Sequence, residues 1–341
     1  MASCITDPVK PRTRALQGIA CAEAGMLFFV VQDVMMKTML ETHSVWLLIF
    51  TRSVVSVLVL VPLIVVLGYP HRLRTALWPI HLLRGALFAC GFSLFYAAFP
   101  FMGLAEVSTI FFSAPLFTAL LAALFLGETI GKHRIAALTV GFAGVVIAVN
   151  PTASGFSPVA VMPLICAVFY AAGQVLARRI GDQESSLTVG LWTLAFSGVL
   201  IFPMGWVVNA VFPLGPEAAH LLISVPDLAL TELPRLALLG LVGMSGYIFL
   251  SRAYQVAPAS LVAPFDYTYL PIATVLAWWL WQEVPQTSTW AGMALITAAG
   301  IYLGLRELRA TSDAPALVGE TAFTPTAPPI PHLSEDETVS R

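Results

Sequence analysis

Charge is what this sequence has least of. Only 11% of its 341 residues are Asp, Glu, Lys or Arg, whereas 58% are hydrophobic. A soluble domain carries about 25% charged residues. Because so few charges cannot solvate a surface, lipid is expected to cover much of the protein. The formal net charge of −2 and the lack of a basic or aromatic binding pattern exclude nucleic acid as a partner.

The motifs of soluble enzymes are also missing. The sequence has no Gly-rich phosphate loop, no His-rich metal motif and no Gly-x-Ser-x-Gly elbow. Its four cysteines lack metal-ligand spacing, and three of them lie in apolar runs, which is typical of small packing residues. We therefore expect no metal, no cofactor and no enzymatic activity. With no nucleotide-binding domain for an ATP-driven pump, any transport would run down a gradient.

Long apolar runs are what the sequence does contain. A membrane-spanning helix needs roughly 20 mainly apolar residues. The sequence predicts an all-α membrane protein with ten spans, at 15–38, 44–67, 79–100, 104–126, 132–149, 158–178, 187–210, 234–255, 258–281 and 288–306. Residues 1–14 precede the spans, and residues 309–341, rich in Pro, Thr, Ser and acids, predict a disordered tail.

The basic residues predict the orientation of the spans. If the N-terminus is cytoplasmic, the inner side receives nearly all loop lysines and arginines, and the outer loops receive only Arg235. Arg84, at the inner end of the third span, is predicted to anchor this orientation. Both termini are then cytoplasmic, and the expected location is the cell inner membrane, with several passes. A homodimer is compatible with this arrangement.

The two halves of the chain repeat. Ala98 matches Ala253 and Glu128 matches Glu283, each pair 155 positions apart. The predicted orientation puts Glu128 inside and Glu283 outside, so the halves 15–150 and 151–308 are inverted. Inverted repeats place a binding site near the bilayer midplane. Glu128 and Glu283 end their spans, which favours helix capping over catalysis.

Ionisable residues inside spans are the strongest indication of a site, because each costs roughly 2.5–3.5 kcal/mol at a helix centre. Asp33 and Lys37 share one helix face, and Arg52 lies at a similar depth in the second span. They predict a cluster for an anionic or zwitterionic group, or alternatively a structural ion pair. Glu23 is a candidate proton carrier, or alternatively a polar group bonded to a neighbouring helix.

The ninth span has an acid and two tyrosines between Pro264 and Pro271. Two prolines weaken a helix locally, which indicates a hinge. Asp266 and Tyr267 are therefore predicted substrate contacts; the alternative is a kinked helix with its tyrosines at the interface.

Three further side chains offer polar tips within apolar stretches. They are Tyr96, Gln174 and Tyr247. Aromatic rings with a few hydrogen-bonding tips suit a planar ligand, whereas each residue alone could equally be packing.

The ten spans, the inverted halves and Gly127-Glu128 at the end of the fourth span resemble the drug/metabolite transporter superfamily, specifically the EamA-like type with two five-helix repeats, over residues 15–308. The second half departs from the pattern, with Gln282-Glu283 in place of Gly-Glu. Asp33 and Lys37, followed by Phe50-Thr51-Arg52, resemble a subgroup with bacterial riboflavin importers and S-adenosylmethionine transporters. The resemblance implies a central cavity and alternating access by rocking of helix bundles.

The expected function is secondary transport of a small metabolite. Riboflavin is the expected substrate, and uptake is the expected direction. Transport or efflux of S-adenosylmethionine, an amino acid or another metabolite is the alternative. A non-transporting receptor or a membrane-embedded enzyme would be a different class. The enzyme would need a clustered acid, base or metal set at one interface, and the sequence has none.

Overall fold

The computed structural model describes residues 11–126, 132–150, 157–180, 183–212, 215–223, 231–257 and 262–311. All regular elements in these ranges are helical. Apolar spans form helices because a helix satisfies its backbone hydrogen bonds internally, which lipid cannot do. The helices are α1 (Pro11–Met39), α2 (Val45–Leu67), α3 (Trp78–Ala97), α4 (Leu104–Phe111), α5 (Ala114–Leu126), α6 (Lys132–Val149), η1 (Pro158–Ala160), α7 (Val161–Ile180), α8 (Ser186–Val211), η3 (Pro216–Leu221), α9 (Leu233–Val256), η4 (Ala263–Thr268), α11 (Tyr269–Trp281) and α12 (Thr287–Thr311).

Seven stretches of the described chain are long and apolar enough to cross a membrane. They correspond to α1, α2, α3, α4 with α5, η1 with α7, α8 and α9. The protein is therefore a multi-pass membrane protein. The predicted spans at 132–149, 258–281 and 288–306 correspond to α6, η4 with α11, and α12, which are not among the seven. The count of ten spans stays a prediction.

Two predicted spans are broken helices. The predicted span over 104–126 corresponds to the apolar stretch Leu104–Phe125, in which α4 ends at Phe111 and α5 begins at Ala114. Pro115 explains the break, since its ring clashes with the carbonyl group four residues earlier. The weakening predicted between Pro264 and Pro271 is confirmed: residues Ala263–Thr268 form a 3-10 helix before α11 begins.

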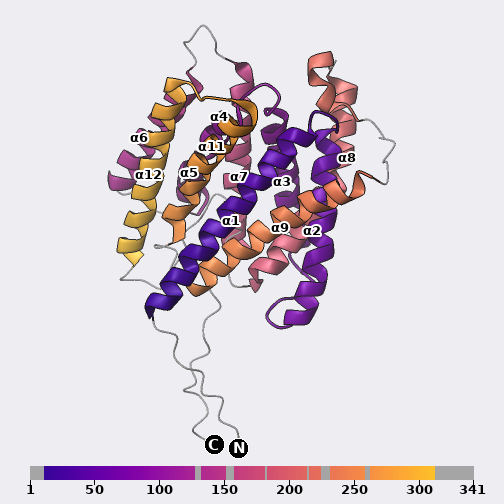
Figure 1. The fold of residues 1–341 in the computed structure, drawn as a ribbon. Helices are drawn as coiled ribbons and strands as arrows, with labels where there is room; N and C mark the ends of the chain where they lie inside the picture. The colour runs from indigo at the N-terminus through magenta and orange to yellow at the C-terminus, as the bar shows by residue number, and fades with distance from the viewer. Residues whose placement is uncertain are drawn as a thin grey trace, which may run out of the picture.

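Helices of the two halves pack against each other in matching pairs. Helix α1 lies along α9, and α3 lies along α7 (Figure 1). At the α1–α9 crossing the backbones nearly touch: a β-carbon on Gly25 would lie 3.2 Å from both the Gly246 carbonyl oxygen and the Leu250 nitrogen. Helices α6 and α12 pair at one edge of the bundle, and α2 and α8 pair at the opposite edge (Figure 1). The centre of the molecule is thus bounded by α1, α2, α3, α7, α8 and α9.

Helix α11 ends in a left-handed residue. Gln282 has φ 56° and ψ 27°, and its N–H donates to the Trp278 carbonyl oxygen over 3.0 Å. The Glu283 N–H reaches back to the Ala277 carbonyl oxygen over 3.3 Å. This ending favours glycine, which has no β-carbon to clash in the left-handed region.

We predict that Gln282→Gly raises the thermal unfolding temperature of the detergent-purified protein. A residue with a β-carbon pays roughly 1–2 kcal/mol for the left-handed conformation, and glycine removes this cost. Part of the gain is lost because glycine has more backbone freedom in the unfolded chain. Gln282→Ala is the matched control, because it shortens the side chain but keeps the β-carbon. Equal melting temperatures for the two variants would contradict the assignment.

Candidate functional site

Asp33 lies at the meeting point of four helices. Its Oδ1 accepts hydrogen bonds from the Tyr96 hydroxyl of α3 over 3.0 Å and from Gln32 Nε2 over 3.2 Å. Its Oδ2 accepts from the Tyr269 hydroxyl of α11 over 2.5 Å, and Ser108 of α4 donates to that hydroxyl over 3.4 Å. Asp33 is only 3% exposed. A carboxylate this deep is held by its hydrogen-bond donors rather than by water.

Arg52 joins the same network from α2. Its Nη1 donates to the Tyr96 hydroxyl over 2.7 Å, and that hydroxyl donates onward to Asp33. The guanidinium carbon lies 5.5 Å from the centre of the Phe88 ring and 5.4 Å from the centre of the Phe92 ring, so two aromatic faces add cation–π attraction. The predicted proximity of Asp33 and Arg52 is therefore observed, with Tyr96 bridging them.

A cavity adjoins this network in the centre of the bundle. It brings together three of the predicted site residues, Arg52, Gln174 and Tyr247. The charged side chains that line it, in the described part of the chain, are Arg52 and Arg84. Aromatic rings form much of its wall, from Phe29, Phe88, Phe92, Phe169, Tyr170 and Tyr247.

Internal hydrogen bonds fix two of the polar tips in the cavity wall. Gln174 donates from Nε2 to the Tyr170 hydroxyl, one helical turn earlier on α7. The Tyr247 hydroxyl donates to the Ser186 carbonyl oxygen at the start of α8 over 2.8 Å. These side chains present a preformed surface to the cavity, as small-molecule sites commonly do.

Arg84 belongs to the cavity, contrary to expectation. From the sequence we would place it at the inner end of the third span as an orientation anchor, but the side chain is buried and its Nε donates to the Gly173 carbonyl oxygen over 3.1 Å. The sequence does contain the signal. An arginine six residues into an apolar run is expensive in a membrane and should count as a candidate site residue.

Lys37 does not join Asp33 and Arg52, so the predicted three-residue cluster does not form. Its ammonium forms an ion pair with Glu283 and lies 4.8 Å from the centre of the Trp281 ring. The other carboxylate oxygen of Glu283 accepts the Leu104 N–H at the start of α4 over 3.1 Å. The capping role predicted for Glu283 is confirmed, while Glu128 lies outside the described residues.

Asp266 and Tyr267 lie away from the cavity. Asp266 Oδ2 accepts from the Tyr254 hydroxyl over 3.1 Å, and the Tyr267 ring packs 5.5 Å from the Phe112 ring. The tyrosine that reaches the site is Tyr269, two residues further along the chain. Which tyrosine reaches Asp33 depends on the 3-10 geometry of η4, and residue spacing alone does not reveal that geometry.

Glu23 also lies apart from the cavity lining. Its Oε2 accepts from the Thr268 hydroxyl over 3.1 Å. This contact corresponds to the alternative considered from the sequence, a polar group bonded to a neighbouring element.

The family model for EamA-like transporters matches residues 16–150 and again residues 158–305. The chain belongs to the EamA-like transporter family. It is therefore a membrane transporter with a small-molecule substrate.

Curated relatives of the transporter carry several names. It is 27% identical to a riboflavin transporter of Brucella anthropi over 254 residues, which is 74% of this chain and 86% of that protein. It is 27% identical to an S-adenosylmethionine uptake transporter of Rickettsia bellii, over 82% of this chain and 90% of that protein. It is 28% identical to a pseudopaline exporter of Pseudomonas aeruginosa, over 84% of this chain and 95% of that protein.

A solved crystal structure shares the fold of the transporter. The two superpose with a TM-score of 0.54 at 18% sequence identity, over 86% of this chain and 98% of the other. At this identity the likeness describes the fold alone.

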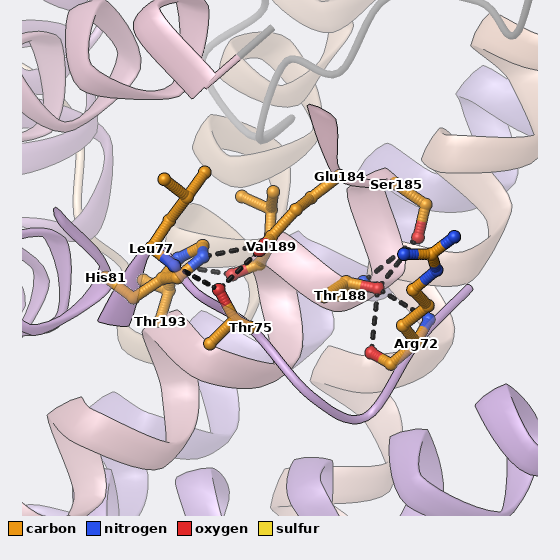
Figure 2. A network of polar contacts seen from close by, with 9 residues as sticks. All are labelled: Arg72, Thr75, Leu77, His81, Glu184, Ser185, Thr188, Val189 and Thr193. Carbon is orange, nitrogen blue, oxygen red and sulfur yellow. Dashed lines mark hydrogen bonds and ion pairs between the residues drawn. The ribbon is translucent and has the colours of Figure 1, made fainter. Parts of the chain in front are cut away.

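A second polar network lies beside the cavity at the other end of α3. Figure 2 shows Glu184, in the connection between α7 and α8, reaching both His81 and Thr75. The His81 Nε2 and Glu184 Oε2 atoms are 2.8 Å apart. Close by, the Thr188 hydroxyl accepts the Arg72 N–H and donates to the Arg72 carbonyl oxygen, both over 3.0 Å (Figure 2). These bonds fasten the connection between α2 and α3 to the start of α8.

A larger hollow of about 720 Å³ lies near the end of α1, with Lys37, Glu283 and His220 in its wall. Burial lowers the pKa of His220, and its Nε2 is 3.1 Å from the Ala97 carbonyl oxygen. The neutral imidazole can donate that hydrogen bond, so the contact is compatible with neutral pH.

Aromatic rings in edge-to-face contact, on α3 and just after its end, lie between this hollow and the central cavity. Phe92 lines the cavity, Phe99 lines the hollow, and Phe95 lies between them with ring centres 5.9 Å and 5.1 Å from its two neighbours. In this structure the transporter therefore has an aromatic barrier on the hollow side of its cavity.

We predict that Tyr269→Phe lowers the thermal unfolding temperature of the detergent-purified transporter. The ring stays, but Asp33 Oδ2 loses its donor at a buried position, which costs about 1–3 kcal/mol. Tyr267→Phe is the matched control two residues away. Equal destabilisation by the two substitutions would show that the hydrogen bond to Asp33 makes no particular contribution to stability.

Proposed function

We propose that the chain is a ten-span carrier of two inverted halves, 15–150 and 151–308, with both termini cytoplasmic. The basic residues of the loops support this orientation. The matching pairs α1–α9 and α3–α7 support two equivalent halves, since each pair joins a first helix to the third helix of the other half. The predicted spans at α6, α11 and α12 complete the count.

We propose riboflavin uptake as the function. The observation that carries it is the central cavity, with aromatic walls and, in the described part of the chain, two arginines as its charged lining. An isoalloxazine ring is flat and aromatic and carries two carbonyl oxygens and two acceptor nitrogens, so rings can stack on it and guanidinium groups can donate to it. The substrate site comprises Arg52, Gln174 and Tyr247, with Asp33 and Tyr96 holding Arg52 in place.

S-adenosylmethionine is the second candidate, because relatives that carry this name match as large a share of the chain. Its sulfonium and ammonium groups are cations. In the described part of the chain, two arginines and no carboxylate line the cavity, and the arginines repel such groups at low dielectric constant. The lining therefore favours the flavin.

Growth of a riboflavin-auxotrophic bacterium tests the function. Expression of the gene should restore growth at limiting riboflavin and should give uptake of labelled riboflavin. Unlabelled riboflavin should compete, whereas excess S-adenosylmethionine should not. Absence of riboflavin uptake would refute the proposed substrate, and competition by S-adenosylmethionine would favour the alternative.

We predict that Arg52→Ala lowers riboflavin uptake at least about tenfold with unchanged membrane abundance. The substitution removes a charge-assisted donor from the cavity, and each such bond contributes about 1.5–3 kcal/mol. Arg235→Ala is the control, since that side chain is 72% exposed. Uptake equal to wild type in Arg52→Ala would exclude Arg52 from the substrate site.

A further inference from the structure

Arg84 carries an unused donor into the cavity. The residue is 5% exposed, and its Nε is taken by the Gly173 carbonyl oxygen. Its Nη1 is buried and has no hydrogen-bond partner among the described residues. Buried polar groups nearly always have a partner, and a guanidinium N–H left unpaired costs more than a neutral one.

No carboxylate is placed to neutralise Arg84 directly. Among the described residues, no acid lines the cavity. Glu184 is the acid whose charge acts on Arg84, but its two oxygens bind Thr75 and His81 (Figure 2). The positive charge therefore remains available to whatever enters the cavity.

Arg84 and Arg52 act at different depths of the cavity. The Arg52 guanidinium lies against Phe88 and Phe92, which are four and eight residues beyond Arg84 on α3. At a rise of 1.5 Å per residue, these intervals cover about 6 Å and 12 Å. Tyr170 and Tyr247 line the cavity together with Arg84. A flat ring lying between such side chains would present its edge to the guanidinium.

We propose that Arg84 binds the C4 carbonyl oxygen and the neighbouring N5 nitrogen on the edge of an isoalloxazine ring, while Arg52 contacts the substrate at the other depth. This inference rests on the proposed riboflavin function and adds that Arg84 recognises the edge of the flavin ring. The planar donor fork of arginine matches neighbouring in-plane acceptors, which a lysine ammonium cannot do. Cationic ligands are selected against, because the two charged residues that line the cavity, among those the structure describes, are both positive.

Quenching of flavin fluorescence by the detergent-purified full chain tests the proposal. The ligands are riboflavin and lumichrome, which has the ring carbonyls but no ribityl chain. Arg84→Gln should weaken binding of both ligands about 10- to 100-fold, as expected for loss of a charge-assisted hydrogen bond. Arg84→Lys should also weaken both, because it keeps the charge but loses the fork. Arg252→Gln, at an exposed position of α9, should bind like wild type.

The outcomes separate the two claims. If wild type binds neither flavin, the riboflavin function fails and this inference fails with it. If wild type binds both and Arg84→Gln binds them equally well, the inference alone is wrong. Weakened binding of riboflavin with unchanged binding of lumichrome would also overturn it, since Arg84 would then contact the ribityl chain. If Arg84→Gln does not fold, the Arg84→Lys variant decides by the same criteria.

Discussion

A charge within a membrane span must find its partner inside the protein, and this constraint shapes the centre of the transporter. Asp33 on α1 and Arg52 on α2 satisfy this constraint together, because both are hydrogen-bonded to one hydroxyl group. Tyr96 accepts from Arg52 and donates to Asp33, so each charge is bonded without direct contact between them. Because Gln32 and Tyr269 supply the remaining donors, the carboxylate is fully engaged. Arg52 is then held at the cavity wall with its aromatic neighbours around it.

The same constraint explains why other ionisable residues lie outside the cavity. Lys37 is paired with Glu283, Glu23 is bonded by Thr268, and His81 is bonded to Glu184. Each contact joins elements far apart in the sequence and so also fixes the fold. What remains for the cavity is a wall of rings with two arginines. Such a wall suits a flat ligand with acceptor oxygens, whichever direction it moves.

The sequence predicted the helices well because apolar length alone determines which segments enter lipid. It also predicted that Asp33 and Arg52 would lie close together, since their depths follow from the span boundaries. It could not predict that Lys37 would turn away, because its partner Glu283 is 246 residues distant. Nor could it choose Tyr269 over Tyr267, because the choice depends on a 3-10 segment before α11. Arg84 was mistaken for an anchor because snorkelling and burial look alike in one sequence.

A double-substitution cycle on riboflavin affinity tests most directly whether Asp33 and Arg52 act as one unit. Asp33→Asn and Arg52→Gln would be measured singly and together in the purified transporter. Because Asp33 acts by holding Arg52, the double variant should bind little worse than Arg52→Gln alone, with a coupling of about 1 kcal/mol or more. Additive losses would contradict the account, since the two residues would then affect binding independently.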